Sequence, residues 1–154
     1  SFDHHGGLKE PLKESLALVD AALDAYVKEI KLLDLWDSTV LVETSEFGRH
    51  MNPNGNMGTD HGWSGNYFMI GGGLKGGRIL GEFPSSLLPN GPQRSGGRVI
   101  PSTPWDSIWN GVAEWMGISG DSNLDEVCPN RGKFDSQILF NATTMFTSPS
   151  SSTS

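Results

Sequence analysis

Apolar residues recur every three or four positions along the first part of the chain. They are Leu8, Leu12, Leu16, Val19, Leu23, Tyr26, Ile30 and Leu33. Charged residues fill most of the positions between them. This spacing predicts an amphipathic helix over residues 8–33, with Pro11 in its first turn, where a missing backbone N–H has no helical partner to lose.

Short runs of β-branched and aromatic residues follow this helix. Residues 39–44 and 66–70 are predicted to be strands, and residues 78–80 a third strand at an edge. A helix followed by a strand without a hairpin favours an α/β layer with a parallel sheet. The stretches between them, residues 47–65 and 81–103, are rich in glycine, asparagine or proline and are predicted to be long loops.

A second helix is predicted to begin at Thr103 and Pro104. Threonine is a good capping residue, and proline suits the first helical position. Three tryptophans and other apolar residues continue the pattern, and Gly117 is expected to end the helix. Residues 124–127 indicate one more helical turn, and residues 134–140 form a last, weak element.

Composition favours one domain with many loops. The chain has 154 residues, of which 36% are apolar, 20 are glycine and 9 are proline. We therefore expect residues 1–140 to form one α/β domain. Residues 141–154, which end in a run of serine and threonine, are predicted to be a disordered tail.

Charge and hydropathy exclude two classes of partner at this stage. The net charge is -7, and the lysines and arginines are scattered, so no basic stripe for a nucleic acid is present. No apolar run reaches the roughly 18–20 residues that span a membrane. Cys128 is the only cysteine, so an internal disulfide is impossible.

The histidines are the main candidates for chemistry. Asp3 and His5 would project to the same side of an extended segment, Glu46 lies at the end of the strand at residues 39–44, and His61 lies in the predicted loop that follows. These four side chains could share a divalent cation. Carboxylates with imidazoles suit zinc, manganese or iron, and magnesium or calcium where carboxylates dominate. Such an ion polarises a phosphoryl or sulfuryl oxygen or activates a water.

A simpler interpretation stays open for each of these signals. Adjacent histidines near a chain start are often only solvated, and Asp–His pairs also cap helices and bridge loops. Asn52, Asn54 and Asn56 are expected to form turns. The glycine-rich stretch at residues 71–77 lacks the phosphate-loop pattern and is interpreted as a tight connection.

Several strings resemble a known family. "FDHHGGL", "TVLVETSEFGRHMNPNGNMGTDHGW", "FMIGGGLKGGRILGEFP" and "TPWDSIWNGVAEWMGI" together resemble the C-terminal half of a sulfatase-like family of the alkaline phosphatase superfamily. The resemblance covers roughly residues 2–140. It implies part of a doubly wound, alkaline-phosphatase-like sheet with flanking helices and long loops. It also implies an exported or extracellular protein.

The same resemblance implies roles for individual residues. Asp3 with His5, Glu46 and His61 match the family's metal ligands, whereas Phe47 stands where a second ligand is usual. The family's nucleophile lies in a half that this chain does not contain. The resemblance therefore implies a missing N-terminal segment or a companion chain as a partner.

Two functions follow as expectations. The first is a metal-dependent hydrolase-like domain for small anionic phosphate or sulfate esters, with Arg49 pairing with the substrate's anionic oxygens. The second is a catalytically inactive, sulfatase-like binding or structural module in an extracellular or multiprotein assembly, which Phe47 favours. A metal-free carbohydrate-binding protein is a third interpretation, based on Trp63, Tyr67 and the asparagines.

Overall fold

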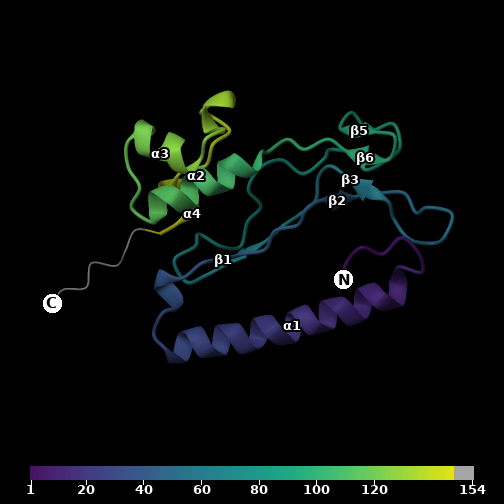
Figure 1. Ribbon diagram of the computed structural model, residues 1–154, viewed down its shortest axis with the longest axis horizontal. Helices are drawn as coiled ribbons and strands as arrows, with labels where there is room; N and C mark the ends of the chain where they lie inside the picture. The colour runs from purple at the N-terminus through teal and green to yellow at the C-terminus, as the bar shows by residue number, and fades with distance from the viewer. Residues whose placement is uncertain (148–154) are drawn as a thin grey trace. The chain divides into compact units, whose positions relative to one another are not determined.

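The computed structural model describes residues 1–147, which contain both helices and strands (Figure 1). The helices are α1 (Lys9–Leu32), α2 (Trp105–Trp115), α3 (Asp121–Val127) and α4 (Ala142–Met145), with 3-10 turns η1 (Trp36–Ser38) and η2 (Arg131–Lys133). The strands are β1 (Leu41–Val42), β2 (Gly48–Arg49), β3 (His61–Gly62), β4 (Met69–Ile70), β5 (Arg94–Ser95) and β6 (Arg98–Val99). Two compact units divide the chain: unit 1 holds residues 1–69 and 84–101, and unit 2 holds residues 70–83 and those from 102 onward.

The strands form three separate two-stranded ladders, β1 with β4, β2 with β3 and β5 with β6. The last two ladders are antiparallel. The fold is therefore mixed α and β, but the expected doubly wound sheet is not found within residues 1–147. The predicted strands at residues 39–44 and 66–70 shorten to β1 and β4. Strands of two residues cannot bury the apolar surface that a doubly wound sheet needs between layers of helices.

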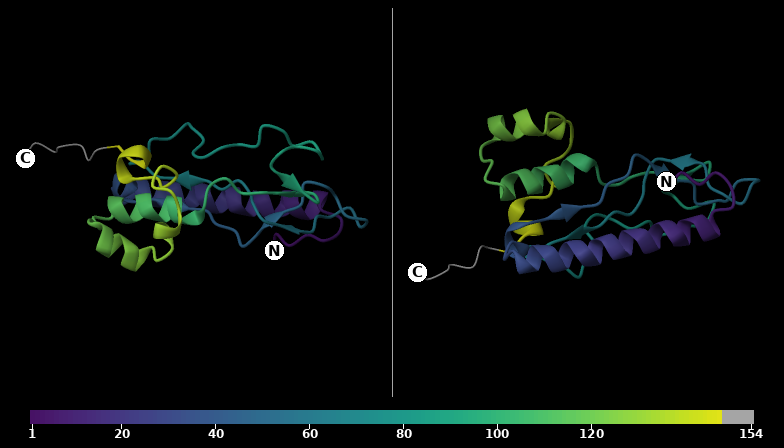
Figure 2. Two further views of the ribbon diagram at one scale, coloured as in Figure 1. Left: turned by 90° about the horizontal axis from the view of Figure 1, so that it is seen from above. Right: turned by 60° about the horizontal axis from the view of Figure 1, so that its bottom comes forward.

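Helix α1 confirms the periodicity of the first segment, within one or two residues at each end. None of its residues is buried, and Leu16 and Leu32 are 52% and 81% exposed. Figure 2 shows it as one unbroken helix. Across the described part of the chain, no helix is both long and apolar enough to cross a membrane.

Both predicted long loops contain a hairpin. Residues 47–65 include β2 and β3, and residues 81–103 include β5 and β6, which Gly96 and Gly97 join with positive φ angles of 55° and 87°. The strand predicted at residues 78–80 is wrong, because this stretch pairs with no other strand in the described residues. Glycines precede and follow it, and its Arg78 Nε donates to the Lys75 carbonyl at 2.8 Å.

The core of unit 2 lies where α2 meets α4. Met145 and Phe146 are 1% and 3% exposed, and the Phe146 ring stacks on Trp115 with 4.7 Å between centroids. Figure 2 shows the short helices α2, α3 and α4 of this unit grouped together. The tail predicted for residues 141–154 is therefore wrong for residues 141–147; residues 148–154 lie outside the described part. Asn141 accepts a hydrogen bond from the Thr144 N–H and so starts α4.

The ends of α2 confirm one prediction and correct another. Gly117 ends the helix with a φ of 95°, and its N–H donates to the Glu114 carbonyl. The N-cap is Pro104, without a side-chain hydrogen bond, so Thr103 does not cap the helix as expected. The residues 134–140 form turns rather than a regular element. Two carbonyls near the end of this stretch, those of Ile138 and Phe140, accept hydrogen bonds from buried side chains of α2.

Candidate metal centre

The β2–β3 hairpin places an arginine opposite a histidine. Arg49 pairs with His61 across the ladder, and Gly48 pairs with Gly62. A Cβ atom at Gly48 would lie only 1.9 Å from the Ser64 carbonyl oxygen, so the chain after β3 comes this close to β2 only because position 48 is glycine. The hairpin therefore fixes Arg49 and His61 as neighbours.

The N-terminal segment, residues 1–8, lies against the loop that joins these two strands. The Gly7 N–H donates to the Asn56 carbonyl at 3.0 Å, and the Leu8 N–H donates to the Met57 carbonyl at 2.9 Å. In the other direction, the Thr59 N–H donates to the His4 carbonyl at 3.0 Å. These backbone bonds bring the first residues of the chain to the hairpin.

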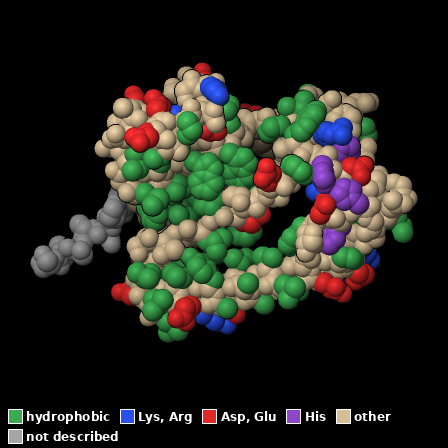
Figure 3. All heavy atoms as spheres, in the orientation of Figure 1, with side chains coloured by type: hydrophobic (Ala, Val, Ile, Leu, Met, Phe, Trp, Pro, Cys, Tyr) green, Lys and Arg blue, Asp and Glu red, His purple; other side chains and the backbone are tan. Residues whose placement is uncertain are grey.

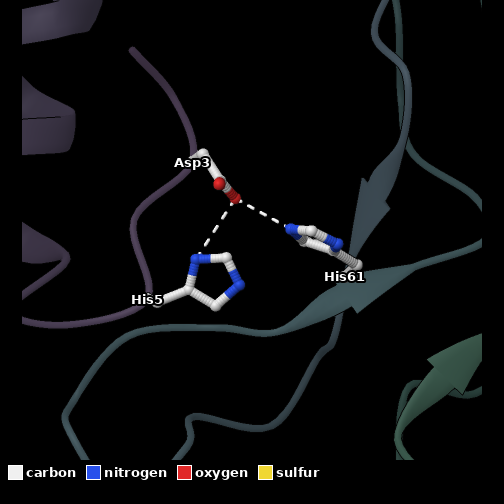
Figure 4. A group of neighbouring side chains, drawn as sticks. All are labelled: Asp3, His5 and His61. Carbon is white, nitrogen blue, oxygen red and sulfur yellow. Dashed lines mark hydrogen bonds and ion pairs between the residues drawn. The ribbon is translucent and has the colours of Figure 1, made fainter.

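Three side chains from the two segments meet at one carboxylate oxygen. Asp3 Oδ1 lies 3.3 Å from His5 Nδ1 and 2.9 Å from His61 Nε2. Figure 4 shows the Asp3 carboxylate between the two imidazole rings, with Asp3 and His5 on the N-terminal segment and His61 on β3. We call Asp3, His5 and His61 the histidine cluster. Figure 3 shows histidine side chains grouped beside acidic and basic ones on the displayed face.

Arg49 also reaches the histidine cluster. Its Nη1 donates to Asp3 Oδ1 at 2.5 Å, while its Nε donates to Thr59 Oγ1 at 3.1 Å and its Nη2 to the Thr59 carbonyl. The hydrogen bond from Arg49, followed by the one from His61, lowers the pKa of Asp3 below its ordinary value. The carboxylate is thus held in its ionised form, which is the form that ligates metals.

The histidine cluster has the chemistry of a cation site. One ligand atom from each residue lies within 4.8 Å of the others, and all three side chains are exposed. One carboxylate with two imidazoles suits Zn²⁺ or another first-row divalent ion and leaves coordination positions for other ligands. These residues therefore fit the cation that the sequence predicts, and their role as ligands stays a prediction.

The structure does not place all the expected site residues together. Glu46 is exposed and does not belong to the histidine cluster, whereas the neighbouring Phe47 packs on His61 with 4.6 Å between ring centroids. Arg49, the residue predicted to pair with an anionic substrate, contacts the Asp3 carboxylate. Thr59 orients Arg49 through its hydroxyl and its carbonyl, and no local sequence pattern marks it, because its partner lies ten residues away.

Comparison with known proteins assigns a family to the first part of the chain. Residues 1–87 match the family described as "Protein of unknown function (DUF1501)". No curated protein and no solved structure matches the chain. The sulfatase-like assignment is therefore wrong. The strings between Phe2 and Trp63 that suggested it lie inside the matched residues, so they belong to the pattern of this other family.

Proposed function

The chain belongs to the DUF1501 family of proteins of unknown function, and from the geometry of the histidine cluster we propose that it is a metal-dependent hydrolase of small phosphate or sulfate esters. The observation that carries this proposal is the meeting of three ligand atoms within 4.8 Å, with a guanidinium on the shared carboxylate. A divalent ion bound there would supply Lewis-acid polarisation of an ester oxygen and activation of a water. The ion itself could be zinc, manganese, magnesium or calcium, and the two imidazoles favour zinc.

Each residue of the site has a part that its contacts support. Asp3 contributes a carboxylate that Arg49 keeps ionised. His5 and His61 each turn one ring nitrogen toward that carboxylate. Ligation by imidazole requires the neutral ring, so proton uptake by either histidine competes with the cation.

Arg49 is the residue proposed to bind the anionic end of the substrate. A guanidinium has five N–H donors, and three of them are used within residues 1–147, one on Asp3 and two on Thr59. Two donors remain for a ligand. Because Thr59 fixes the plane of the guanidinium, these donors are already oriented and suit the oxygens of a tetrahedral phosphate or sulfate group.

We also propose that a companion segment or chain completes the site. His5 and His61 have side chains that are each 46% exposed, and Glu46 does not supply a fourth ligand. Hydrolytic sites usually exclude bulk water around the reacting groups. The exposed leucines of α1 add apolar surface for such a partner to cover.

The test measures metal content and turnover of the full-length protein together. Elemental analysis after purification, followed by assays with aryl phosphate and aryl sulfate esters, should show bound metal and turnover that a chelator removes. The His61→Ala variant should lose both. Absence of bound metal and of turnover in the wild-type protein would reject the proposal.

A second function is favoured by the position of Phe47. Its ring is half exposed and lies against the His61 imidazole, with 42° between the two ring planes. A flat apolar side chain at a ligand suits a binding or structural module that holds a cation without catalysis. The same assays separate the two functions, since this module would retain metal and give no turnover with either ester.

A further inference from the structure

Asn54 uses all of its hydrogen-bonding capacity to join three parts of unit 1. Its Nδ2 donates to the His5 carbonyl at 3.0 Å and to Asp60 Oδ1 at 2.9 Å. Its Oδ1 accepts from the N–H groups of Asn56 and Gly58, both at 3.0 Å. A carboxamide has two N–H donors and two acceptor positions, so every one is filled. The opposite orientation of the amide would lose all four bonds, which fixes the assignment of its nitrogen and oxygen.

The loop around Asn54 also lies unusually close to the N-terminal segment. A Cβ atom at Gly58 would lie 2.2 Å from the His5 carbonyl carbon and 2.4 Å from the Gly6 nitrogen. No side chain can occupy this position unless the two backbones separate. Gly55, in the same loop, has no atom within 4 Å of its Cβ position. The loop therefore has no room for a side chain at position 58, whereas it has room for one at position 55.

These contacts decide whether the histidine cluster exists. Asp3 and His5 come from the N-terminal segment, and His61 comes from β3, so the segment must be docked for the three to meet. The Asp3 and His5 side chains are 56% and 46% exposed, so packing of these two side chains contributes little to the docking. Hydrogen bonds to the loop at residues 54–59 hold the segment, together with the contact of Arg49 with Asp3.

We propose that Asn54 is a positioning residue that holds the N-terminal segment on the loop and thereby assembles the histidine cluster. The part of this inference that concerns metal affinity rests on the proposed function. Partners that orient first-shell ligands typically change metal affinity by roughly 10–100-fold. Docking and metal binding must also be reciprocal, so that a bound cation protects the docked segment.

The decisive experiment separates the bond to His5 from the turn that Asn54 also forms. In the double variant Asn54→Asp with Asp60→Asn, the new carboxylate still accepts the two turn N–H groups. The new amide at position 60 can donate to it, so the turn and the contact with position 60 are kept, whereas the bond to the His5 carbonyl is replaced by repulsion between two acceptor oxygens. Asn54→Ala removes the turn bonds as well. Gly55→Ala is the matched control, since it changes the same loop without a new contact.

Two measurements are made on the full-length protein. Hydrogen exchange without metal follows the amides of Gly7, Leu8 and Thr59, which dock the segment but do not bond to the Asn54 side chain. Calorimetry with Zn²⁺ gives the affinity of the histidine cluster. We expect faster exchange at these three amides and roughly 10-fold or greater loss of Zn²⁺ affinity in both Asn54 variants, with no change in Gly55→Ala. Saturating Zn²⁺ should slow exchange at the same amides in the wild-type protein.

Different results overturn different claims. Unchanged exchange at the three amides in the double variant would overturn the positioning role. So would a defect confined to Asn54→Ala, because it would trace the effect to the turn. If the wild-type protein binds no Zn²⁺, the proposed function fails, and the exchange data still decide the positioning role. Should Asn54→Ala not fold, the milder double variant provides the comparison.

Discussion

Unit 2 buries the side chains that anchor it, whereas unit 1 keeps its chemically active side chains half exposed. In unit 2, Ser107, Asn110 and Met145 are at most 3% exposed. In unit 1, the side chains of Asp3 and His61 are 56% and 46% exposed. Unit 2 depends on the packing of buried side chains. The histidine cluster of unit 1 depends on backbone hydrogen bonds between the N-terminal segment and the loop of the β2–β3 hairpin.

The polar contacts of the two units differ in the same way. In unit 2, Arg131 joins the buried Asn110 to two acidic side chains of α3, and Asn110 in turn donates to the Phe140 carbonyl. These bonds close a network around a packed core. In unit 1, Arg49 and the two histidines converge on one exposed oxygen of Asp3. Elements held by few apolar contacts open locally at a low free-energy cost, so we expect the histidine cluster of unit 1 to open more readily than the core of unit 2.

The largest effect is expected in the core of unit 2. Met145→Ala should lower the free energy of unfolding by about 2–5 kcal/mol, because it leaves a cavity against α2. Met116→Ala is the control, since Met116 is 73% exposed and its loss should cost within about 0.5 kcal/mol. Chemical denaturation of both variants measures the difference. Equal costs would mean that packing at α4 does not anchor unit 2.

The next effect concerns metal affinity in unit 1. His61→Ala removes a proposed ligand and should weaken Zn²⁺ binding beyond the roughly 100-fold that loss of an outer-shell partner reaches. His4→Gln keeps the backbone carbonyl that accepts from Thr59, and it replaces a part-buried ring outside the histidine cluster by a side chain of similar size. Calorimetry should find near wild-type affinity for this control. Similar losses in both variants would show that Zn²⁺ affinity does not depend on the geometry of the histidine cluster.

Arg49 sharpens the comparison because its removal should have two opposite effects. Arg49→Gln deletes a positive charge beside Asp3. The cation then no longer competes with a guanidinium for the Asp3 carboxylate, so Zn²⁺ affinity should rise a few-fold. Binding of inorganic phosphate to the metal-loaded protein should fall in the same variant. Arg49→Lys retains the charge without the planar fork and should lose phosphate binding with little gain in Zn²⁺ affinity. If both affinities fall in Arg49→Gln, the arginine only supports the fold.

The sequence predicts best those elements whose periodic pattern runs over many residues. Helix α1 shows its spacing over more than six turns, and the residues of α2 carry a strong apolar face with Gly117 as its stop. The same reasoning does not predict the β2–β3 and β5–β6 hairpins. Strands of two residues are too short to show an alternating pattern. Their pairing instead depends on close backbone approach at glycines, such as Gly48, which the sequence shows only as loop composition.

The sequence likewise predicts only part of the candidate site. Residue chemistry marks Asp3, His5 and His61, and the structure brings them together, but it leaves Glu46 outside. The turn role predicted for Asn54 is present in its bonds to Asn56 and Gly58. Its bond to the His5 carbonyl, 49 residues away, could not be inferred, because local turn chemistry says nothing about a distant partner.

The smallest effect tests the one acidic residue of unit 1 whose environment opposes its charge. Burial raises the pKa of Glu43, in spite of a backbone hydrogen bond from Phe68 that acts the other way. A carboxyl group with a raised pKa in the folded state stabilises the fold fully below its unfolded pKa, and this contribution is lost as pH rises through the folded pKa. Glu43→Gln should therefore be more stable than the wild-type protein at pH 7, by roughly 0.5 kcal/mol or less, and the gain should shrink as pH falls through the raised pKa of Glu43 and vanish below the ordinary glutamate pKa. Denaturation curves at several pH values, with the exposed Glu10→Gln as control, measure this trend. A gain that does not change with pH would mean that ionisation of Glu43 costs unit 1 nothing, and that its strand end is as open to water as its histidine cluster.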